Sequence, residues 1–261
     1  MSDGLRRMHL LGAADQVLRA LALSAALPSN FAFRRANPGF ALPPSALAFE
    51  TLGHVSAREY RETGESHARL FASLLREACA NPSPHVMEWG CGTGRILRHL
   101  EAEGLPAGRL VGVDVDAAAI EWCRSNLPHI EFVHCAALPP LPFPARTLDG
   151  IYHYSVLTHL APEAALAWLD EIRRVLRDDG VMIGTTHGER YADMLFAREL
   201  RDFRSGAIVT RRWAAEGRKR FLSFHPPDAF REMLAARFHE VRRVEDRGIP
   251  QDLWIARGPR R

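Results

Sequence analysis

The chain has 261 residues, and its hydrophobic content of 47% is enough to bury a full core within one elaborated domain. Its 34 basic and 31 acidic residues give a net charge of +3, which argues against nucleic acid as an obligatory partner. Its four cysteines form no C-x-x-C pair. They therefore favour reduced thiols of a cytoplasmic protein and argue against a disulfide framework or a metal site.

The first 27 residues mix basic, apolar and small side chains and so imitate a signal peptide. Polar residues as far as Arg19 interrupt the apolar run, and the remaining Ala20–Leu27 is much shorter than the ~18 residues that cross a bilayer. The leucines recur at helical spacing, which predicts an amphipathic helix packed on the domain or on a second copy of the chain. With the proline- and aromatic-bearing segment that follows, residues 1–64 are expected to form a helical cap or lid on a domain spanning 65–261.

Helical and extended patterns alternate through the middle of the chain. Short apolar runs between amphipathic helical patterns predict an α/β fold, with a doubly wound, mostly parallel sheet covered by helices on both faces. The extended runs lie at 85–89, 109–115, 130–136, 148–156 and 180–187, and helical patterns begin near Ser66, Thr93, Asp116 and Pro162.

The last third of the chain has a different pattern. A helix near Arg190 leads to two short extended runs, at 207–213 and 219–225, and then to a helix that starts at the two prolines after His225. Two strands with only a few residues between them close the chain, which predicts an antiparallel pair at the edge of the sheet.

The stretch "VMEWGCGTGRILRHL" (86–100) places three glycines directly after an apolar run and before a helical pattern. Such a turn brings bare backbone N–H groups and the positive end of a helix dipole to one point, and side chains at the glycines would block a ligand. The dinucleotide fingerprint needs a glycine where this chain has Arg95, and a P-loop needs a longer loop ending in Gly-Lys-Ser/Thr. A carboxylate at Glu88 would repel a pyrophosphate, whereas it suits a cationic ligand.

The pattern E-x-G-x-G-x-G resembles the first signature of the class I, Rossmann-like S-adenosylmethionine-dependent methyltransferases. The resemblance extends from about Ser66 to the end and implies a seven-stranded sheet with an antiparallel C-terminal strand. "HYSVLTHL", "LDEIRRVLRDDGVMIGTTHG" and "QDLWIARGP" look like a bacterial subgroup that acts on small molecules, glycans or lipid-linked intermediates. In that family the substrate pocket is built from the cap and from an insertion after the fifth strand, here 28–64 and about 190–225.

The resemblance implies that S-adenosylmethionine is the cofactor and S-adenosylhomocysteine the product. Asp114, at the end of the second extended run, is expected to accept hydrogen bonds from the ribose hydroxyls, while Asp116 caps the next helix. The family's usual acid after the third strand is missing from "FVHCAALPPLPF", and the next acid is Asp149. The expected cofactor-binding residues are Glu88, Gly90, Cys91, Gly92, Gly94, Asp114, Val115, Cys135, Ala136 and Ser155, with Cys135 and Ala136 bounding the adenine.

Methyl transfer demands that acceptor, methyl and sulfur lie in line, and a hydroxyl acceptor also gains from a base whose pKa is near the working pH. Histidine is the usual base. His153, His159 and His187 stand at predicted strand ends, and we rank His159 first and His187 second as catalytic candidates for transfer to oxygen. A packing or capping role is the alternative for each.

Two other functions remain open at this level. One is a nucleotide-dependent oxidoreductase on the same fold, which Arg95 and Glu88 disfavour. The other is a cofactor-binding protein of this fold with lost or altered chemistry. The expected partner is a small-molecule, glycan or lipid-linked substrate, with oligomerisation possible through the N-terminal helix and no transmembrane segment.

Overall fold

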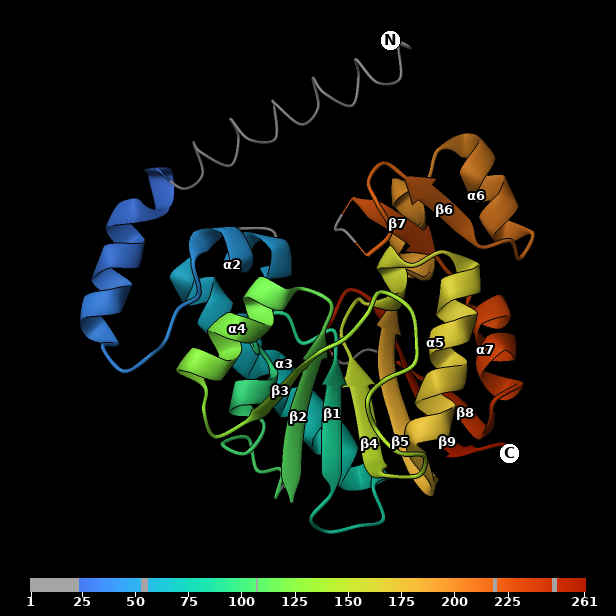
Figure 1. Cartoon of the computed structure of the whole chain (residues 1–261). Coiled ribbons are helices and arrows are strands. Elements are labelled where there is room, and N and C mark those ends of the chain that lie inside the picture. Colours follow the sequence, from blue (N-terminus) through green and yellow to red (C-terminus); the bar gives the residue numbers. More distant parts are fainter. Residues whose placement is uncertain (1–23, 53–55, 107, 218–219, 246–247) are drawn as a thin grey trace.

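The computed structural model describes residues 24–52, 56–106, 108–217, 220–245 and 248–261. A seven-stranded sheet in the order β3-β2-β1-β4-β5-β9-β8 forms its centre (Figure 1). The strands are β1 (His85–Trp89), β2 (Arg109–Asp114), β3 (Glu131–His134), β4 (Leu148–His153), β5 (Leu176–Thr186), β8 (Phe238–Val244) and β9 (Asp252–Pro259). Strands β1 to β5 pair in parallel, while β9 is antiparallel to both β5 and β8. The predicted α/β fold with an antiparallel C-terminal strand is confirmed.

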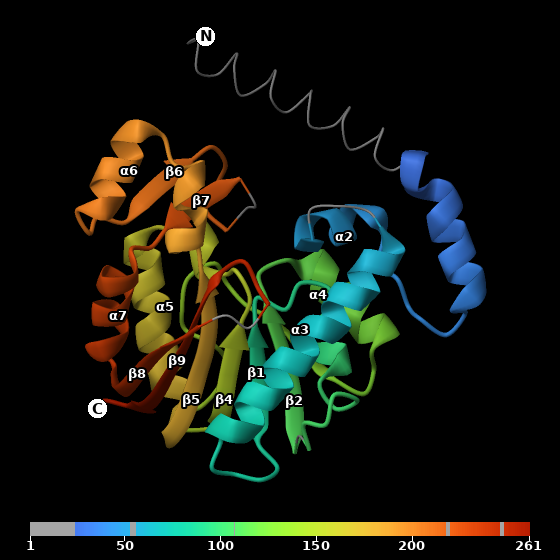
Figure 2. The same ribbon diagram turned by 180° about the vertical axis from the view of Figure 1, so that it is seen from behind.

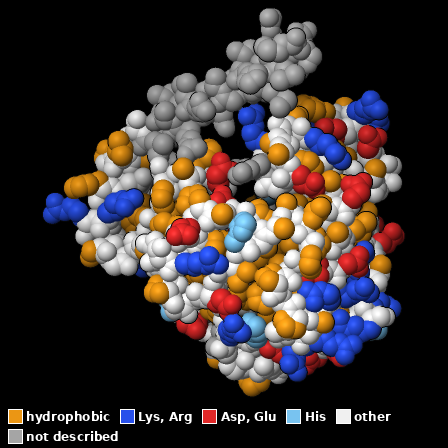
Figure 3. All heavy atoms as spheres, in the orientation of Figure 1, with side chains coloured by type: hydrophobic (Ala, Val, Ile, Leu, Met, Phe, Trp, Pro, Cys, Tyr) orange, Lys and Arg blue, Asp and Glu red, His pale blue; other side chains and the backbone are white. Residues whose placement is uncertain are grey.

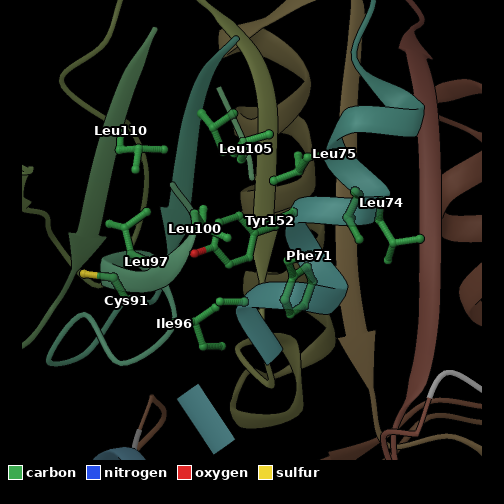
Figure 4. Packing of buried hydrophobic residues seen from close by; sticks show 14 of the residues in the cluster. Phe71, Leu74, Leu75, Cys91, Ile96, Leu97, Leu100, Leu105, Leu110 and Tyr152 are labelled. Atoms are coloured by element: carbon green, nitrogen blue, oxygen red, sulfur yellow. The ribbon is translucent and has the colours of Figure 1, made fainter. Parts of the chain in front are cut away.

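Helices cover both faces of the sheet, as near-continuous apolar strands require. Helices α3 (Ala57–Ala78) and α4 (Ala117–Asn126) contribute to the core on one face, and α5 (Pro162–Val175) and α7 (Pro227–Ala235) to the core on the other. Figure 2 shows α3 crossing β1 and β2 from behind. In the first core, the ring of Phe71 in α3 lies 4.7 Å from the ring of Tyr152 in β4 (Figure 4).

Helix α3 begins earlier than expected. Ser56 caps it by accepting a hydrogen bond from the Glu59 backbone N–H at 3.2 Å, so the helix starts at Ala57 and not near Ser66. Sequence periodicity missed this start because the first turns carry charged residues on their exposed side. The expected division at 64/65 therefore falls inside one continuous helix.

The sequence pattern predicts an α-helix from Thr93 to Glu103, and this prediction is wrong. The structure has turns there and only a short 3-10 helix, η1 (Leu97–His99). An α-helix would join the Leu97 N–H to the Thr93 carbonyl, but Glu88 accepts from Leu97 N at 3.0 Å and the Tyr60 hydroxyl bonds Thr93 O at 3.2 Å. Side chains from other elements therefore replace the first helical bond.

The remaining elements rise above the carboxyl ends of the parallel strands, which lie at the upper edge of the sheet in Figure 1. On one side stand helical residues 24–36 and α2 (Ser45–Leu52), and the cap packs through Phe40, whose ring lies 6.5 Å from that of Tyr60. On the other side stand η3 (Glu189–Met194), α6 (Ala197–Arg204) and the antiparallel pair β6 (Val209–Arg212) and β7 (Phe221–Phe224). The leucine-bearing helix expected before residue 24 lies outside the described residues. In the part that is described, no helix combines the length and apolar character needed to cross a membrane.

Candidate active site

The glycine turn leaves the end of β1 as the sequence predicts. Gly90, Gly92 and Gly94 have φ angles of +73°, +51° and +64°, a region that L side chains rarely adopt. A Cβ atom at Gly90 would also lie 2.3 Å from Cγ2 of Val156, so that glycine is needed for packing as well as for conformation. Three left-handed residues at alternate positions give a tight concave backbone surface at the carboxyl edge of the sheet.

Asp114 ends β2 beside this turn. Its Oδ2 accepts a hydrogen bond from Gly92 N at 2.7 Å and its Oδ1 accepts from Asp116 N at 2.8 Å. Asp116 is the helix cap, because its side chain accepts from Ala118 N and Ala119 N. The predicted capping role of Asp116 is therefore confirmed. An ionised carboxylate has about four acceptor positions, so Asp114 keeps acceptor capacity for a ligand beyond its backbone hydrogen bonds.

Glu88 is turned inward beneath the glycine turn. It is 3% exposed, and its Oε2 accepts from Leu97 N at 3.0 Å and from the Tyr152 hydroxyl at 2.9 Å. Burial raises the pKa of Glu88 to about 8, against the opposing effects of the Tyr152 hydrogen bond and of the nearby Arg95 charge. The carboxyl group therefore holds the end of the turn through Leu97 N, and its protonation state changes near pH 8.

Two residues that the sequence analysis did not predict connect the turn with α3. One is Tyr60 of α3, and the other is Arg95 of the turn itself. The Tyr60 hydroxyl contacts both Thr93 O and, at 2.8 Å, Thr93 Oγ1, and burial raises the pKa of Tyr60 to about 12. Arg95 is 4% exposed and points between α3 and the end of β4. Tyr60 lies in a segment without clear periodicity, and Arg95 drew notice only as the residue that breaks the dinucleotide pattern, so no local signal marked either one.

The hydrogen-bond partners of Arg95 in the described chain are neutral, and Glu88 is the acid whose charge acts on it. Its guanidinium donates to Thr63 Oγ1 and to His67 Nδ1, both at 3.2 Å, and its Nε is buried without a hydrogen-bond partner in the described chain. Because arginine can only donate, Nδ1 of His67 accepts and the ring proton sits on Nε2. Burial, and then the Arg95 charge, lowers the pKa of His67 to about 3, so His67 is neutral. A buried cation with neutral hydrogen-bond partners is suited to an anionic ligand.

The ends of β2 and β3 present apolar surface. Val115 is 44% exposed and Leu138 is 56% exposed, and Ala136 between the strands is also exposed. Cys135 is buried, its backbone N–H bonds Asp114 O at 3.0 Å, and burial raises its pKa to about 12. The carboxyl group of Asp149 lies at the opposite end of the sheet, where it accepts from His85 N, so it takes no part at this edge.

The end of β4 holds Ser155 in a left-handed conformation, with φ at +64°. Ser155 N donates to Thr185 Oγ1 and its hydroxyl lies 2.8 Å from Thr158 Oγ1. Gln251, which precedes β9, donates from Nε2 to Ser155 Oγ at 2.8 Å. A non-glycine residue with this φ persists only where surrounding contacts hold it, and such residues cluster at functional sites.

The three candidate histidines have different surroundings. His153 is fully buried against the ring of Trp89, inside the second core, and burial lowers its pKa to about 3. His187 is 6% exposed and stacked 4.2 Å from the Tyr191 ring, and burial lowers its pKa to about 3 as well. A pKa this low keeps both rings neutral but makes them weak bases.

His159 lies in η2 (Leu157–His159) and is only partly buried. Its Nδ1 is 2.8 Å from the backbone carbonyl of Phe221 in β7. A carbonyl only accepts, so Nδ1 carries the proton and Nε2 holds the lone pair of the neutral ring. The β6–β7 hairpin thus sets the tautomer that a general base requires.

Arg211, in β6 of the hairpin, has an acidic partner. Arg211 is 6% exposed and is paired with Glu199, which also lowers the Glu199 pKa. On the face shown in Figure 3, basic and acidic side chains are interspersed over much of the surface. A pocket lined by Arg146, Arg173, Arg260 and Arg261 lies beside Asp178 at the start of β5, at the edge opposite the glycine turn.

Comparison with known proteins agrees with this geometry. Residues 86–180 match the family model described as a methyltransferase domain. A probable S-adenosylmethionine-dependent methyltransferase of Mycolicibacterium smegmatis is 34% identical over 112 residues, covering 43% of this chain and 40% of that protein. An uncharacterised 37.1 kDa protein from a Streptomyces fradiae transposon is 35% identical over 121 residues, covering 44% of this chain and 34% of that protein. The chain thus spans well under half the length of these relatives.

Solved structures share the fold. An amino pentose methyltransferase from Micromonospora echinaspora, solved with bound S-adenosylmethionine, superimposes with a TM-score of 0.54 at 17% identity, covering 75% of this chain and 91% of that one. These solved structures show the shared fold alone. Residues 86–180 of this chain are a methyltransferase domain, and over that region the chain is similar to S-adenosylmethionine-dependent methyltransferases.

Proposed function

We propose that the protein transfers a methyl group from S-adenosylmethionine to an oxygen of a small-molecule, glycan or lipid-linked acceptor. The observation that carries the proposal is the left-handed turn of Gly90, Gly92 and Gly94 beside a carboxylate, Asp114, that keeps acceptor capacity for ribose hydroxyls. The exposed Val115 and Leu138 side chains support the adenine end of the site. Relatives of this chain named as methyltransferases act on different acceptors, among them trans-aconitate in Paracidovorax citrulli.

The remaining cofactor contacts follow from the same surface. Cys91 Sγ lies within the turn, and Cys135 and Ala136 border the adenine side, where a backbone edge takes the place of the missing acid. Ser155 borders the methionine part from β4. Glu88 acts from beneath the turn, and a cation bound above it favours its ionised form.

Arg95 is a further candidate contact, at the methionine end of the cofactor. Its buried guanidinium has neutral hydrogen-bond partners and an unpaired Nε in the described chain, and the methionine part of S-adenosylmethionine carries a carboxylate. A charge-assisted hydrogen bond there would neutralise the buried cation. We therefore include Arg95 among the cofactor-binding residues.

When bound, S-adenosylmethionine supplies a methyl group whose bond to sulfur breaks with its electron pair left on sulfur. The acceptor oxygen forms the new bond to carbon and gives up its proton. His159 receives that proton on Nε2, since its Nδ1–H is committed to the Phe221 carbonyl. His187 is the second candidate, and its depressed pKa makes it the weaker base.

The proposal is tested by binding and by turnover. Isothermal titration calorimetry should detect S-adenosylmethionine and S-adenosylhomocysteine, and Asp114→Ala should weaken both by about 1.5–3 kcal/mol, the usual worth of hydrogen bonds to a charged group. Asp114→Asn is the matched control, because it keeps the shape and part of the acceptor capacity. Equal affinity in the wild type and Asp114→Ala would remove the ribose assignment.

Turnover is measured with a methyl-labelled cofactor and a low-molecular-weight cell extract. We expect label in a product that survives mild base, as an ether does and a methyl ester does not. Cofactor binding without any labelled product would favour a binding protein with lost chemistry. A base-labile product would move the acceptor from a hydroxyl to a carboxylate.

A further inference from the structure

Hydrogen bonds at the end of β4 determine how the amide of Gln251 is oriented. Thr158 Oγ1 lies 2.6 Å from the carbonyl oxygen of Ser155 and 2.8 Å from the hydroxyl of the same residue. A carbonyl only accepts and a threonine hydroxyl has one proton, so that proton goes to the Ser155 carbonyl. The Ser155 hydroxyl must then donate to Thr158 Oγ1.

This order leaves Ser155 Oγ as an acceptor for Gln251. The Gln251 nitrogen lies 2.8 Å from it, so the amide presents its NH₂ group to Ser155 and its oxygen away from it. A flipped amide would bring two oxygens together with no proton between them. The orientation of this side chain therefore follows from proton counting along Thr158, Ser155 and Gln251.

The oxygen of this amide has no hydrogen-bond partner among the residues that the structure describes. Gln251 is 7% exposed, and its Oε1 is buried without a hydrogen-bond partner in the described ranges of the chain. Leaving a buried acceptor unpaired is costly, typically about 1–3 kcal/mol. Native structures retain such a group mainly where it serves a ligand or a strained site.

A second unpaired atom lies across the strand ends. The antiparallel register pairs Thr186 of β5 with Asp252 of β9, so the next residues outward, His187 and Gln251, lie opposite each other. His187 is 6% exposed, and its Nδ1 is also buried without a partner among the described residues. Both atoms stand at the carboxyl edge of the sheet, beyond the strand ends where ligands of this fold gather.

We propose that Gln251 is a specificity-determining residue whose Oε1 accepts a hydrogen bond from an O–H or N–H group of the methyl acceptor, in a subsite shared with His187. This inference rests on the proposed function, because it concerns the acceptor of that reaction. It names the class of acceptor as one that presents a neutral hydroxyl, amine or amide donor here. A carboxylate or phosphate oxygen would bring a second lone pair against Oε1 in a buried site.

The test compares Gln251→Met, Ser155→Ala and Gln251→Glu with the wild type. Gln251→Met removes both the bond to Ser155 and the acceptor oxygen. Ser155→Ala removes the bonds of the Ser155 hydroxyl to Gln251 and to Thr158 but leaves Oε1 in place. Gln251→Glu keeps an acceptor oxygen and a similar shape but loses the N–H group that donates to Ser155. Its acceptor KM is therefore compared with that of Ser155→Ala, and it is measured even where Gln251→Met does not fold. The probe is the extract fraction that the wild type labels, and affinity for S-adenosylhomocysteine is measured in parallel.

We expect Gln251→Met to raise the acceptor KM by about 10- to 100-fold, as the loss of one buried hydrogen bond predicts, with a smaller change in kcat. Ser155→Ala should raise the KM by a clearly smaller factor, and Gln251→Glu should have a KM nearer to that of the wild type. Affinity for S-adenosylhomocysteine should stay within about twofold for Gln251→Met, a difference well below one hydrogen bond.

Four results overturn the inference. The first is an unchanged acceptor KM in Gln251→Met, and the second is an acceptor KM that rises as much in Ser155→Ala as in Gln251→Met. The third is an acceptor KM in Gln251→Glu as high as that in Gln251→Met, and the last is weakened S-adenosylhomocysteine binding in Gln251→Met. The second result would mean that Gln251 only supports Ser155, and the last would place it against the cofactor. A wild type that binds S-adenosylhomocysteine but labels nothing removes the proposed function and this inference together, and is distinguished by the wild-type assay alone.

Discussion

At the scale of single residues, the site holds a buried arginine and a buried glutamate close to the glycine turn. Arg95 is a buried cation with neutral hydrogen-bond partners, and Glu88 is a buried acid whose pKa is raised to about 8. Glu88 precedes and Arg95 follows the three glycines that have positive φ angles. A zwitterionic, cationic ligand would complement both groups, since it offers a carboxylate to one and positive charge to the other.

Arg95→Gln should weaken S-adenosylmethionine binding by about 10-fold or more, because a charge-assisted hydrogen bond is lost. Decarboxylated S-adenosylmethionine lacks only the carboxylate, so the same substitution should leave its affinity nearly unchanged. Calorimetry with both ligands measures the difference. Arg98→Gln is the matched control, since Arg98 is a neighbouring arginine that bonds Ala41 O at 2.8 Å and lies over the Phe40 ring. Equal losses for both ligands would show that Arg95 acts only through the shape of the turn.

Glu88 makes a prediction about pH. Its pKa of about 8 in the folded state lies above the ordinary value of 4.5, so the stability contributed by its protonated form is fully present below pH 4.5. That contribution is lost as the pH rises through the folded pKa, because the unfolded chain then releases its proton first. Glu88→Gln keeps a neutral group and should lose less stability than the wild type between pH 5 and pH 8. Urea unfolding at several pH values tests this, and parallel curves for the two proteins would contradict it.

At the scale of elements, α3 shapes the cofactor turn. Tyr60 reaches from α3 to Thr93 and takes the carbonyl that a helix would have used, while Glu88 takes Leu97 N. The result is a 3-10 turn at Leu97–His99 where the sequence pattern predicts an α-helix. Local helix propensity is therefore overridden by two buried side-chain bonds.

Tyr60→Phe should lower the free energy of unfolding by about 1–3 kcal/mol, because two buried oxygens of Thr93 lose their shared partner. It should also weaken S-adenosylhomocysteine binding, since the turn is less firmly held. Urea titration and calorimetry measure the two effects. A matched control is Thr63→Val, on the same helix, which alters an Arg95 contact but not the Thr93 bonds. Full stability in Tyr60→Phe would show that these bonds do not hold the turn.

At the scale of the whole molecule, two additions rise above the carboxyl edge of the sheet on either side of the glycine turn (Figure 1). The hairpin β6–β7 connects to the sheet through His225 N, which donates to His187 O at 2.8 Å. It also holds His159 by the Phe221 carbonyl. The orientation of the candidate base therefore depends on a segment far from it in sequence.

His159→Ala should lower turnover on a hydroxyl acceptor by about 10²–10⁴-fold, the usual share of a general base, with cofactor affinity near normal. The measurement is steady-state kinetics with calorimetry of the variant. His187→Ala is the comparison, and the low pKa of His187 predicts a smaller effect on kcat. Full turnover by His159→Ala on a demonstrated hydroxyl substrate would remove the base assignment.

The sequence alone determined the features that depend on neighbouring residues. Alternating apolar runs and helical patterns predicted the α/β sheet, the three glycines predicted a sharp turn after the first strand, and the pair Asp114 and Asp116 predicted a strand-end acid next to a cap. Each of these signals is local, because periodicity, capping and φ preference act over a few residues. The closing antiparallel pair was predicted from the short connection between its two strands.

Only the tertiary structure decided which side chains meet. The bond from Gln251 to Ser155 joins residues 96 positions apart, and the bond from Tyr152 to Glu88 joins residues 64 apart. Such pairs depend on strand order and register, which no local pattern encodes. The same reason explains why His153, which ends β4, is buried in the core while His159, six residues later, is held at the edge. Local chemistry specified the glycine turn, and long-range packing specified the groups that surround it.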